Sequence, residues 1–152
     1  MHFRLIDRVL ERTETQITAI KVVSASEEYL QDHFPTFPVL PGVFMLEAMV
    51  QTGRELALPA GGRLVLGRVR ALKYGSFVRP GDVLTCEVKL LNRFNDGSLD
   101  LKGKATVGCS TGSGASATAC SGRFLLRPVR FGSPGVNNVL ASGVGAETAA
   151  KS

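Results

Sequence analysis

The strongest constraint on the fold of this chain is a proline-rich segment that runs directly into its most apolar stretch. Three of the residues in 34–41 are prolines, and each proline fixes its own φ angle and pushes the preceding residue towards extended geometry. Residues 34–41 are therefore predicted to form a rigid, irregular segment. Gly42 follows, and we predict a helix from Val43 to about Leu58 that ends at Pro59.

Apolar side chains cover nearly the whole circumference of this helix in its first half. A helix that is apolar all round is typical of a protein core, so we predict that this half is buried on every side and wrapped by a sheet. Glu47 is the one ionisable residue in that half, while Gln51, Arg54 and Glu55 make the second half more polar.

The remaining chain is predicted to supply that sheet. Alternating apolar and β-branched residues favour strands, and the predicted strands are 8–12, 16–23, 63–74, 83–94, 99–107 and 123–130. Asp96-Gly97, between two alternating runs, is a strong hairpin signal, and the small-residue stretch 108–122 is predicted to contain a loose hairpin loop. The sequence thus predicts an α+β domain with one buried helix and five or six mostly antiparallel strands.

The length of 152 residues suits a single domain with a proper core, which we assign to residues 1–130. Residues 131–152 are rich in Gly, Ala and Ser with few large apolar side chains, so we predict a flexible C-terminal tail. The charged N-terminus lacks the pattern of a signal peptide. The longest apolar run is shorter than the about 20 residues that cross a bilayer. We therefore expect a cytoplasmic protein without membrane insertion.

The net charge of +5 favours acidic partners. Nucleic acid is not expected, because the chain has no Lys/Arg run and no basic and aromatic interleaving. The cysteines have no metal-ligand spacing and their odd number argues against a disulfide framework. We expect small, buried or half-buried thiol side chains at Cys86, Cys109 and Cys120.

Two titratable residues in the opening stretch suggest acid–base chemistry. Desolvation in an apolar helix is expected to raise the pKa of Glu47, and His33 has an ordinary pKa near neutrality. Gly42, at the start of the helix, offers a backbone N–H at which an oxyanion can settle. The residues alone leave structural roles open, since a histidine in a proline-rich loop is often structural and Glu47 can pair with Arg54 or Gln51.

Three motifs in this stretch resemble the signature of the FabZ/FabA-type (3R)-hydroxyacyl-[acyl-carrier-protein] dehydratases. They are His33-Phe34-Pro35, Pro38-Val39-Leu40-Pro41-Gly42-Val43 and Glu47-Ala48-Met49-Val50-Gln51. Further similarity lies in segments 3–11, 71–74 and 78–82, so the resemblance covers roughly residues 3–127. It implies the hot-dog fold, in which an antiparallel sheet wraps a long central helix. It also implies a homodimer, often assembled further into a trimer of dimers, and no metal or organic cofactor.

The resemblance also implies a role for each motif residue. His33 would remove the C2 proton of the hydroxyacyl thioester, and Glu47 of the other subunit would protonate the departing C3 hydroxyl. The Gly42 N–H would hold the thioester oxygen, the Val39 carbonyl would orient His33, and Gln51 would position the Glu47 carboxyl group. The side chains expected along the substrate pocket are Phe34, Phe37, Pro41 and Phe44. The implied activity is that of a hydro-lyase in fatty-acid or related lipid biosynthesis.

This sequence departs from the family pattern in three places. Asp32 replaces the usual glycine before the histidine, Thr36-Phe37 replaces a glycine-containing pair, and segment 108–122 is longer than the family hairpin. Two other functions therefore stay open: a hot-dog acyl thioesterase, and a catalytically weak paralogue that binds acyl carrier protein. Basic residues can form a docking surface for the acidic carrier protein or an ordinary solvated face; they are Arg68, Arg70, Lys73, Arg79, Arg123, Arg127 and Arg130.

Overall fold

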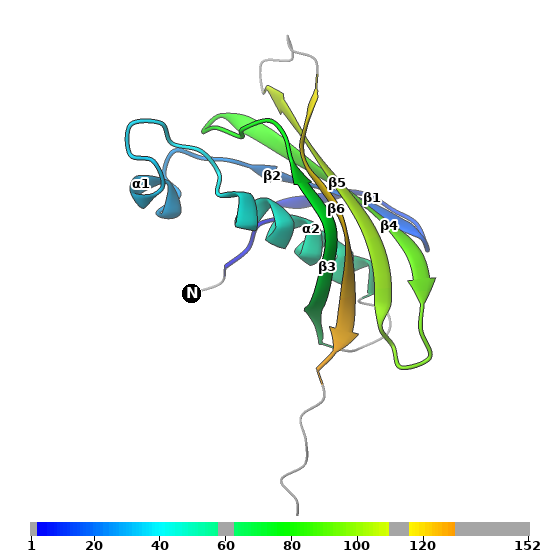
Figure 1. Ribbon diagram of the computed structural model, residues 1–152. Coiled ribbons are helices and arrows are strands. Elements are labelled where there is room, and N and C mark those ends of the chain that lie inside the picture. The colour runs from blue at the N-terminus through cyan, green and yellow to red at the C-terminus, as the bar shows by residue number, and fades with distance from the viewer. Residues whose placement is uncertain (1–2, 58–62, 110–115, 130–152) are drawn as a thin grey trace, which may run out of the picture.

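A strongly curved antiparallel sheet wraps one long helix, α2 (Gly42–Ala57), as Figure 1 shows. The computed structural model describes residues 3–57, 63–109 and 116–129. Within these residues a short helix, α1 (Tyr29–Asp32), precedes α2, and the sheet has six strands. The strands are β1 (Arg8–Arg12), β2 (Gln16–Val22), β3 (Leu64–Tyr74), β4 (Asp82–Arg93), β5 (Leu99–Cys109) and β6 (Ala117–Pro128).

The strands lie in the order β1-β2-β4-β5-β6-β3, and every neighbouring pair is antiparallel. This order leaves β1 and β3 as the two edges. The predicted turn at Asp96-Gly97 joins β4 to β5, with Gly97 at a φ of +85°, a region that glycine adopts without steric cost. The predicted α+β architecture, with a central helix wrapped by an antiparallel sheet, is confirmed.

The core lies between the concave face of the sheet and one side of α2. Strand residues alternate between this core and the outer face, because successive side chains of a strand point to opposite sides. On β2, for example, Ile17 and Ala19 are fully buried. The large buried side chains that meet α2 include Leu84, Leu101, Phe124 and Leu126, and Met45 and Met49 face them from the helix.

The prediction that the first half of α2 is buried on every side is wrong for the single chain. Val43 is 64% exposed, and Phe44, Leu46 and Glu47 are only partly buried. The physical reason is that the sheet covers one side of the helix, while Phe3 and Tyr29 cover the opposite side only in part. The apolar residues on that side are therefore available to contact another molecule.

Two strand boundaries need correction. β5 continues to Cys109 and β6 begins at Ala117, so both strands extend further into the small-residue stretch than the predicted bounds 99–107 and 123–130. The remainder of that stretch, 110–115, and the predicted tail, 131–152, lie outside the described residues.

Two glycines of β5 differ sharply in their surroundings and test the packing of α2 on the sheet. A Cβ atom at Gly103 would lie 2.7 Å from the Met49 sulfur and 3.0 Å from Phe124 Cε1. We expect Gly103→Ala to lower the free energy of unfolding by about 1–3 kcal/mol through overpacking, measured by urea denaturation at fixed protein concentration.

The matched control is Gly108→Ala in the same strand, where a Cβ atom meets no heavy atom within 4 Å. Both changes have the same effect on backbone freedom in the unfolded chain, so the difference reports packing. Equal stabilities of the two variants would contradict this description of the α2–β5 contact.

Candidate functional site

His33 lies directly after α1 and opens the proline-rich loop. Its ring packs against Phe34 with the ring centroids 4.5 Å apart, and Phe34 has a φ of +52°. The Phe37 N–H donates to the Phe34 carbonyl (2.8 Å), and the Leu40 N–H donates to the Val78 carbonyl (2.8 Å). The first bond closes a turn within the loop, the second joins the loop to the connection between β3 and β4, and the segment is irregular, as predicted.

A cavity of about 220 Å³ brings His33 together with the start of α2. Its lining residues come from the loop, the helix and the β3–β4 connection, and include His33, Phe34, Val39, Gly42, Met45, Tyr74 and Phe77. Of the predicted site residues, His33, Val39, Gly42 and Phe34 therefore share one cavity in the single chain.

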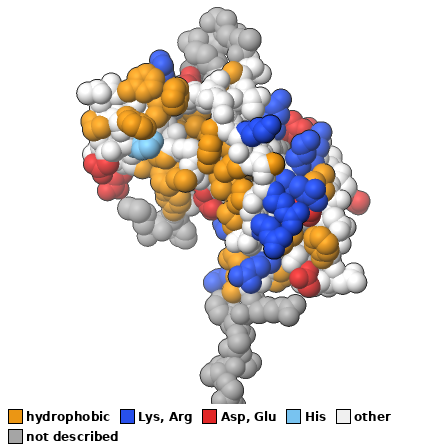
Figure 2. Space-filling view, viewed as in Figure 1, with side chains coloured by type: hydrophobic (Ala, Val, Ile, Leu, Met, Phe, Trp, Pro, Cys, Tyr) orange, Lys and Arg blue, Asp and Glu red, His pale blue; other side chains and the backbone are white. Residues whose placement is uncertain are grey.

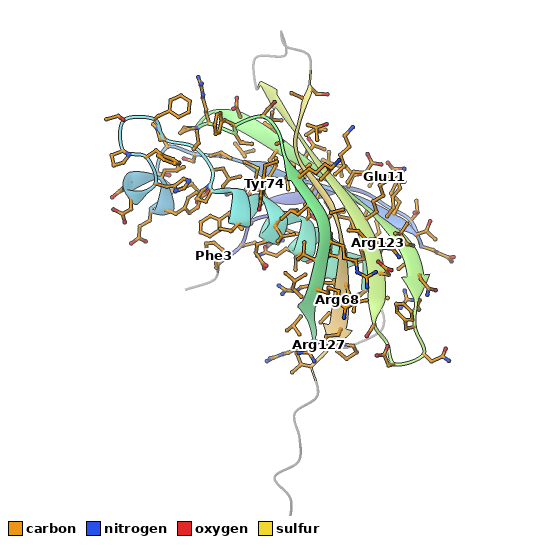
Figure 3. All side chains as sticks on the ribbon, in the orientation of Figure 1. Phe3, Glu11, Arg68, Tyr74, Arg123 and Arg127 are labelled. Atoms are coloured by element: carbon orange, nitrogen blue, oxygen red, sulfur yellow. The ribbon has the colours of Figure 1, made fainter. Side chains whose placement is uncertain are left out.

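The Tyr74 ring lies so close to Gly42 that a side chain at this position would have to displace it. A Cβ atom at this position would lie 2.9 Å from Tyr74 Cε1, a contact that real Cβ atoms do not make. Figure 3 shows Tyr74 beside the N-terminal end of α2. The carbonyl of Pro41 accepts the N–H groups of Phe44 (2.9 Å) and Met45 (3.3 Å). The Gly42 N–H has no acceptor among the described residues, which is typical of the first turn of a helix.

Glu47 lies on the side of α2 that the sheet does not cover. Its side chain is 30% exposed, so the predicted burial of the first half of the helix on every side is wrong for Glu47 in the single chain. One oxygen, Oε1, accepts hydrogen bonds from Gln51 Nε2 (3.1 Å) and Arg54 Nη1 (3.1 Å). Both pairings considered from the sequence therefore occur. Glu47 does not line the cavity of His33.

Gln51 connects this carboxyl group to the N-terminal segment. Its Oε1 accepts the Leu5 N–H (2.8 Å), and its Nε2 donates to the Phe3 carbonyl (3.2 Å) as well as to Glu47. The amide is thus held at both ends, and its orientation fixes the donor that faces Glu47.

The remaining predicted pocket residues lie outside the His33 cavity. Phe44 packs edge-to-face against Phe3 and Tyr29, with ring centroids 5.0 Å and 4.8 Å away. Pro41 is buried and does not line the cavity. Phe37 packs edge-to-face against Phe77 (5.7 Å), with the Arg79 guanidinium 4.5 Å from its ring centroid.

Sequence reasoning did not assign Tyr74, Phe77 and Met45 to the site. Met45 lines it from α2, and Tyr74 and Phe77 reach it because the end of β3 and the connection after it fold over the start of α2. Gly75 is the local signal: a Cβ atom there would lie 2.3 Å from the Thr118 carbonyl oxygen, so only glycine lets the chain turn so close to β6. The sequence showed the glycine but not the strand beside it.

Basic side chains gather on the outer face of the sheet, seen as the blue strip in Figure 2. Four of them stand at one register level across four neighbouring strands, since Lys89 pairs with Lys102, Lys102 with Arg123, and Arg123 with Arg70. Like charges directly opposite one another are unfavourable, so this face favours an anionic partner.

A shallow groove of about 540 Å³ runs over this face and is lined by Arg68, Arg70 and Arg123 among others. Arg123 binds Asp100 through two parallel bonds, one of them from Nε to Oδ1 (2.8 Å), and this pairing lowers the pKa of Asp100. Figure 3 shows Arg68, Arg123 and Arg127 along β3 and β6. Arg68 and Arg70 have no ion-pair partner among the described residues.

The matching family model and the curated relatives are named as dehydratases. The family model described as ApeI-like, ApeI dehydratase, matches residues 9–113. The 3-hydroxyacyl-[acyl-carrier-protein] dehydratase FabZ of Lactococcus lactis subsp. cremoris is 43% identical over 95 residues, which are 60% of this chain and 66% of the relative, slightly less than two thirds of its length. FabZ of Chloroflexus aggregans is 40% identical over 130 residues, 82% of this chain and 84% of the relative.

Solved structures share the fold at low identity. The dehydratase heterocomplex ApeI:P from Xenorhabdus doucetiae has a TM-score of 0.61 at 17% identity, covering 79% of this chain and 94% of that chain. A hypothetical thioesterase with coenzyme A from Streptococcus pneumoniae has a TM-score of 0.59 at 13% identity, covering 80% of this chain and 84% of that chain. These likenesses establish the hot-dog fold and do not discriminate between the two activities.

The described residues contain neither a group of three His, Cys, Asp or Glu side chains that forms a metal site nor a helix long and apolar enough to cross a membrane.

Burial changes the acidity of two cysteines. It raises the pKa of the Cys86 thiol to about 12 and that of the Cys120 thiol to about 11. The predicted burial of these two cysteines is confirmed; the side chain of Cys109 lies outside the described part.

These raised pKa values predict unreactive thiols in the folded protein. At pH 8 both groups remain protonated, and the thiolate is the form that reacts. In a Cys109→Ser variant, which removes the third thiol, we expect no release of colour from Ellman's reagent until urea unfolds the chain and exposes Cys86 and Cys120. Rapid labelling of the native variant would contradict their described burial.

Proposed function

This chain belongs to the ApeI-like dehydratase family, and on that premise we propose that it removes water from (3R)-hydroxyacyl thioesters carried by acyl carrier protein. The product is the trans-2-enoyl thioester. The observation that carries the proposal is the shared cavity of His33, Gly42 and Val39, because it holds a base beside a free helix N–H. The named activity of relatives about 40% identical supports the same assignment.

We assign the base to His33. A neutral imidazole accepts the C2 proton of the substrate, and the resulting charge on the thioester oxygen is stabilised by the Gly42 N–H and the α2 dipole. Gly42 can serve because its N–H has no acceptor among the described residues. In this scheme the Val39 carbonyl orients the imidazole; that hydrogen bond remains a prediction.

We assign the acid to Glu47 of a second copy of the chain. It protonates the C3 hydroxyl, the C3–O bond breaks, and the electron pair of the former C2–H bond forms the double bond. One water leaves, and the proton taken by His33 balances the proton given by Glu47, so no cofactor enters the reaction. Gln51 supports this role, since it donates to the Glu47 carboxyl group.

Two surfaces of the single chain favour a homodimer. Val43, Phe77 and Phe34 are 64%, 63% and 58% exposed around the α2 start and the cavity, and exposed apolar groups of this size mark contact surfaces. β3 is an open edge strand of 11 residues, and such an edge is a template for pairing with another chain. Further assembly into a trimer of dimers remains an expectation from the family resemblance.

The proposed carrier protein is acidic, so its docking surface should contain basic side chains that are not already in ion pairs. Arg68 and Arg70 on β3 have no ion-pair partner among the described residues, and both line the outer groove. The cytoplasmic location and a place in fatty-acid or related lipid biosynthesis belong to the same proposal.

The first test removes the two proton-transfer groups separately. We expect His33→Ala and Glu47→Gln each to lower kcat for a 3-hydroxyacyl thioester by about 100-fold or more, the usual range for a general acid or base, followed at the enoyl absorbance. Circular dichroism confirms folding. Full activity in both variants would exclude the mechanism, and release of free thiol by the parent would favour a thioesterase instead.

Mixing the two inactive variants tests whether each site draws on two chains. Random exchange makes half of the dimers mixed, and one of the two sites in a mixed dimer then has both intact residues. About one quarter of the parental activity should return. A site built within one chain predicts no recovery, because neither chain of the mixture carries both groups.

Charge reversal on β3 tests the carrier-protein surface. We expect Arg68→Glu with Arg70→Glu to raise KM for the carrier-linked substrate about tenfold, with kcat unchanged and KM for the coenzyme A thioester unaffected, because interfacial charges act mainly on encounter. Arg12→Glu on exposed β1 is the control. Equal effects on both substrates, or none on either, would contradict the assignment.

A further inference from the structure

We infer that Arg54 is a positioning residue that clamps the carboxyl group of Glu47 and couples it to the free edge of the sheet. The inference rests on the proposed role of Glu47 as the acid, and it assigns a function to a residue outside the motifs that carry the family resemblance.

The clamp arises from helical spacing. Glu47, Gln51 and Arg54 are four and three residues apart along α2, so their side chains lie on one face. Gln51 Nε2 and Arg54 Nη1 both donate to Glu47 Oε1, each at 3.1 Å. The other oxygen, Oε2, has no partner among the described residues. Two donors on one oxygen restrict rotation of the carboxyl group and leave Oε2 as the atom available to a substrate hydroxyl.

Arg54 is itself anchored at the start of β3. Its Nε donates to the carbonyl of Leu64 at 2.9 Å. The Val129 N–H donates to the carbonyl of Arg63 (2.9 Å), and successive residues of an antiparallel strand direct their backbone groups to opposite sides. The Leu64 carbonyl therefore points away from β6, towards the open edge, and Arg54 satisfies it there.

The two anchors come from different parts of the chain. Gln51 is held by the N-terminal segment through Leu5 and Phe3, and Arg54 is held by the edge strand. The Glu47 carboxyl group is thus oriented by both, on the face of α2 where the second copy is proposed to sit. A movement of the N-terminal segment or of the edge strand therefore shifts Gln51 or Arg54, and with it the position of Glu47 Oε1.

The charge of Arg54 suits a proton donor. After Glu47 has given its proton to the leaving hydroxyl it is a carboxylate, and a guanidinium binds that form best. The interaction therefore strengthens as the proton is transferred, which is the condition for lowering a barrier rather than only binding substrate. Gln51 is neutral and cannot supply this contribution.

The pair is not an important element of the fold. The side chains of Arg54 and Glu47 are 36% and 30% exposed, and ion pairs with this exposure contribute little to stability. Variants of Arg54 are therefore expected to fold, so that changes in rate report on positioning.

The test compares Arg54→Met and Arg54→Lys with the parent in dehydration of a 3-hydroxyacyl thioester. We expect Arg54→Met to lower kcat about tenfold or more through a misplaced acid, with KM and the midpoint of urea unfolding unchanged. Arg54→Lys should recover only part of the rate, because an ammonium cannot make the forked contact to Leu64 and Glu47. Added guanidinium chloride should partly restore Arg54→Met, while equal sodium chloride should not.

The matched control is Arg8→Met, which removes an equal charge from exposed β1 at the opposite edge of the sheet, and parental kinetics are expected for it. An active parent with an unchanged kcat in Arg54→Met would overturn the inference and leave the proposed function intact. A parent without turnover would reject the proposed function. In that case the proton–nitrogen NMR signal of Arg54 Nε decides the clamp: a Glu47→Gln change should shift it, and an unchanged signal would overturn the clamp.

Discussion

The one-sided burial of α2 determines most of what this protein can do. The sheet covers the helix face that carries Met45 and Met49, and the opposite face keeps Val43 and Glu47 accessible. A helix this apolar is costly to leave uncovered in water. This exposure leaves the Glu47 carboxyl group on the face where the second copy is proposed to sit.

Close backbone approach shapes the cavity that His33 lines. At Gly42 and Gly75 a side chain would collide with the Tyr74 ring and with the Thr118 carbonyl. Both glycines let β3 and the connection after it close over the start of α2, and this closure forms the wall of the His33 cavity. The wall depends on contacts between segments more than 30 residues apart, so its shape follows from the tertiary fold rather than from the loop alone.

Local patterns predicted the elements well and their surroundings poorly. The Asp96-Gly97 turn and the helix start after Pro41 follow from backbone preferences that act within a few residues, and both are confirmed. The burial of Val43 and Glu47 was mispredicted, because an apolar helix face looks the same whether the chain's own sheet or another molecule covers it. The predicted ends of the two strands beside the small-residue stretch fall short, since Gly, Ser and Ala have little strand preference, yet pairing between neighbouring strands extends β5 and β6 into part of it.

The ion pair between Glu47 and Arg54 has both a structural and a catalytic interpretation. From the sequence, a pairing of Glu47 with Arg54 counted as a structural alternative to catalysis. The structure contains that pairing, but its partial exposure leaves it little value for stability, and its geometry directs one carboxylate oxygen away from both donors. A contact that stabilises the fold weakly while orienting a reactive group closely is better explained by the reaction than by the fold. The ion pair therefore supports the proposed acid instead of competing with it.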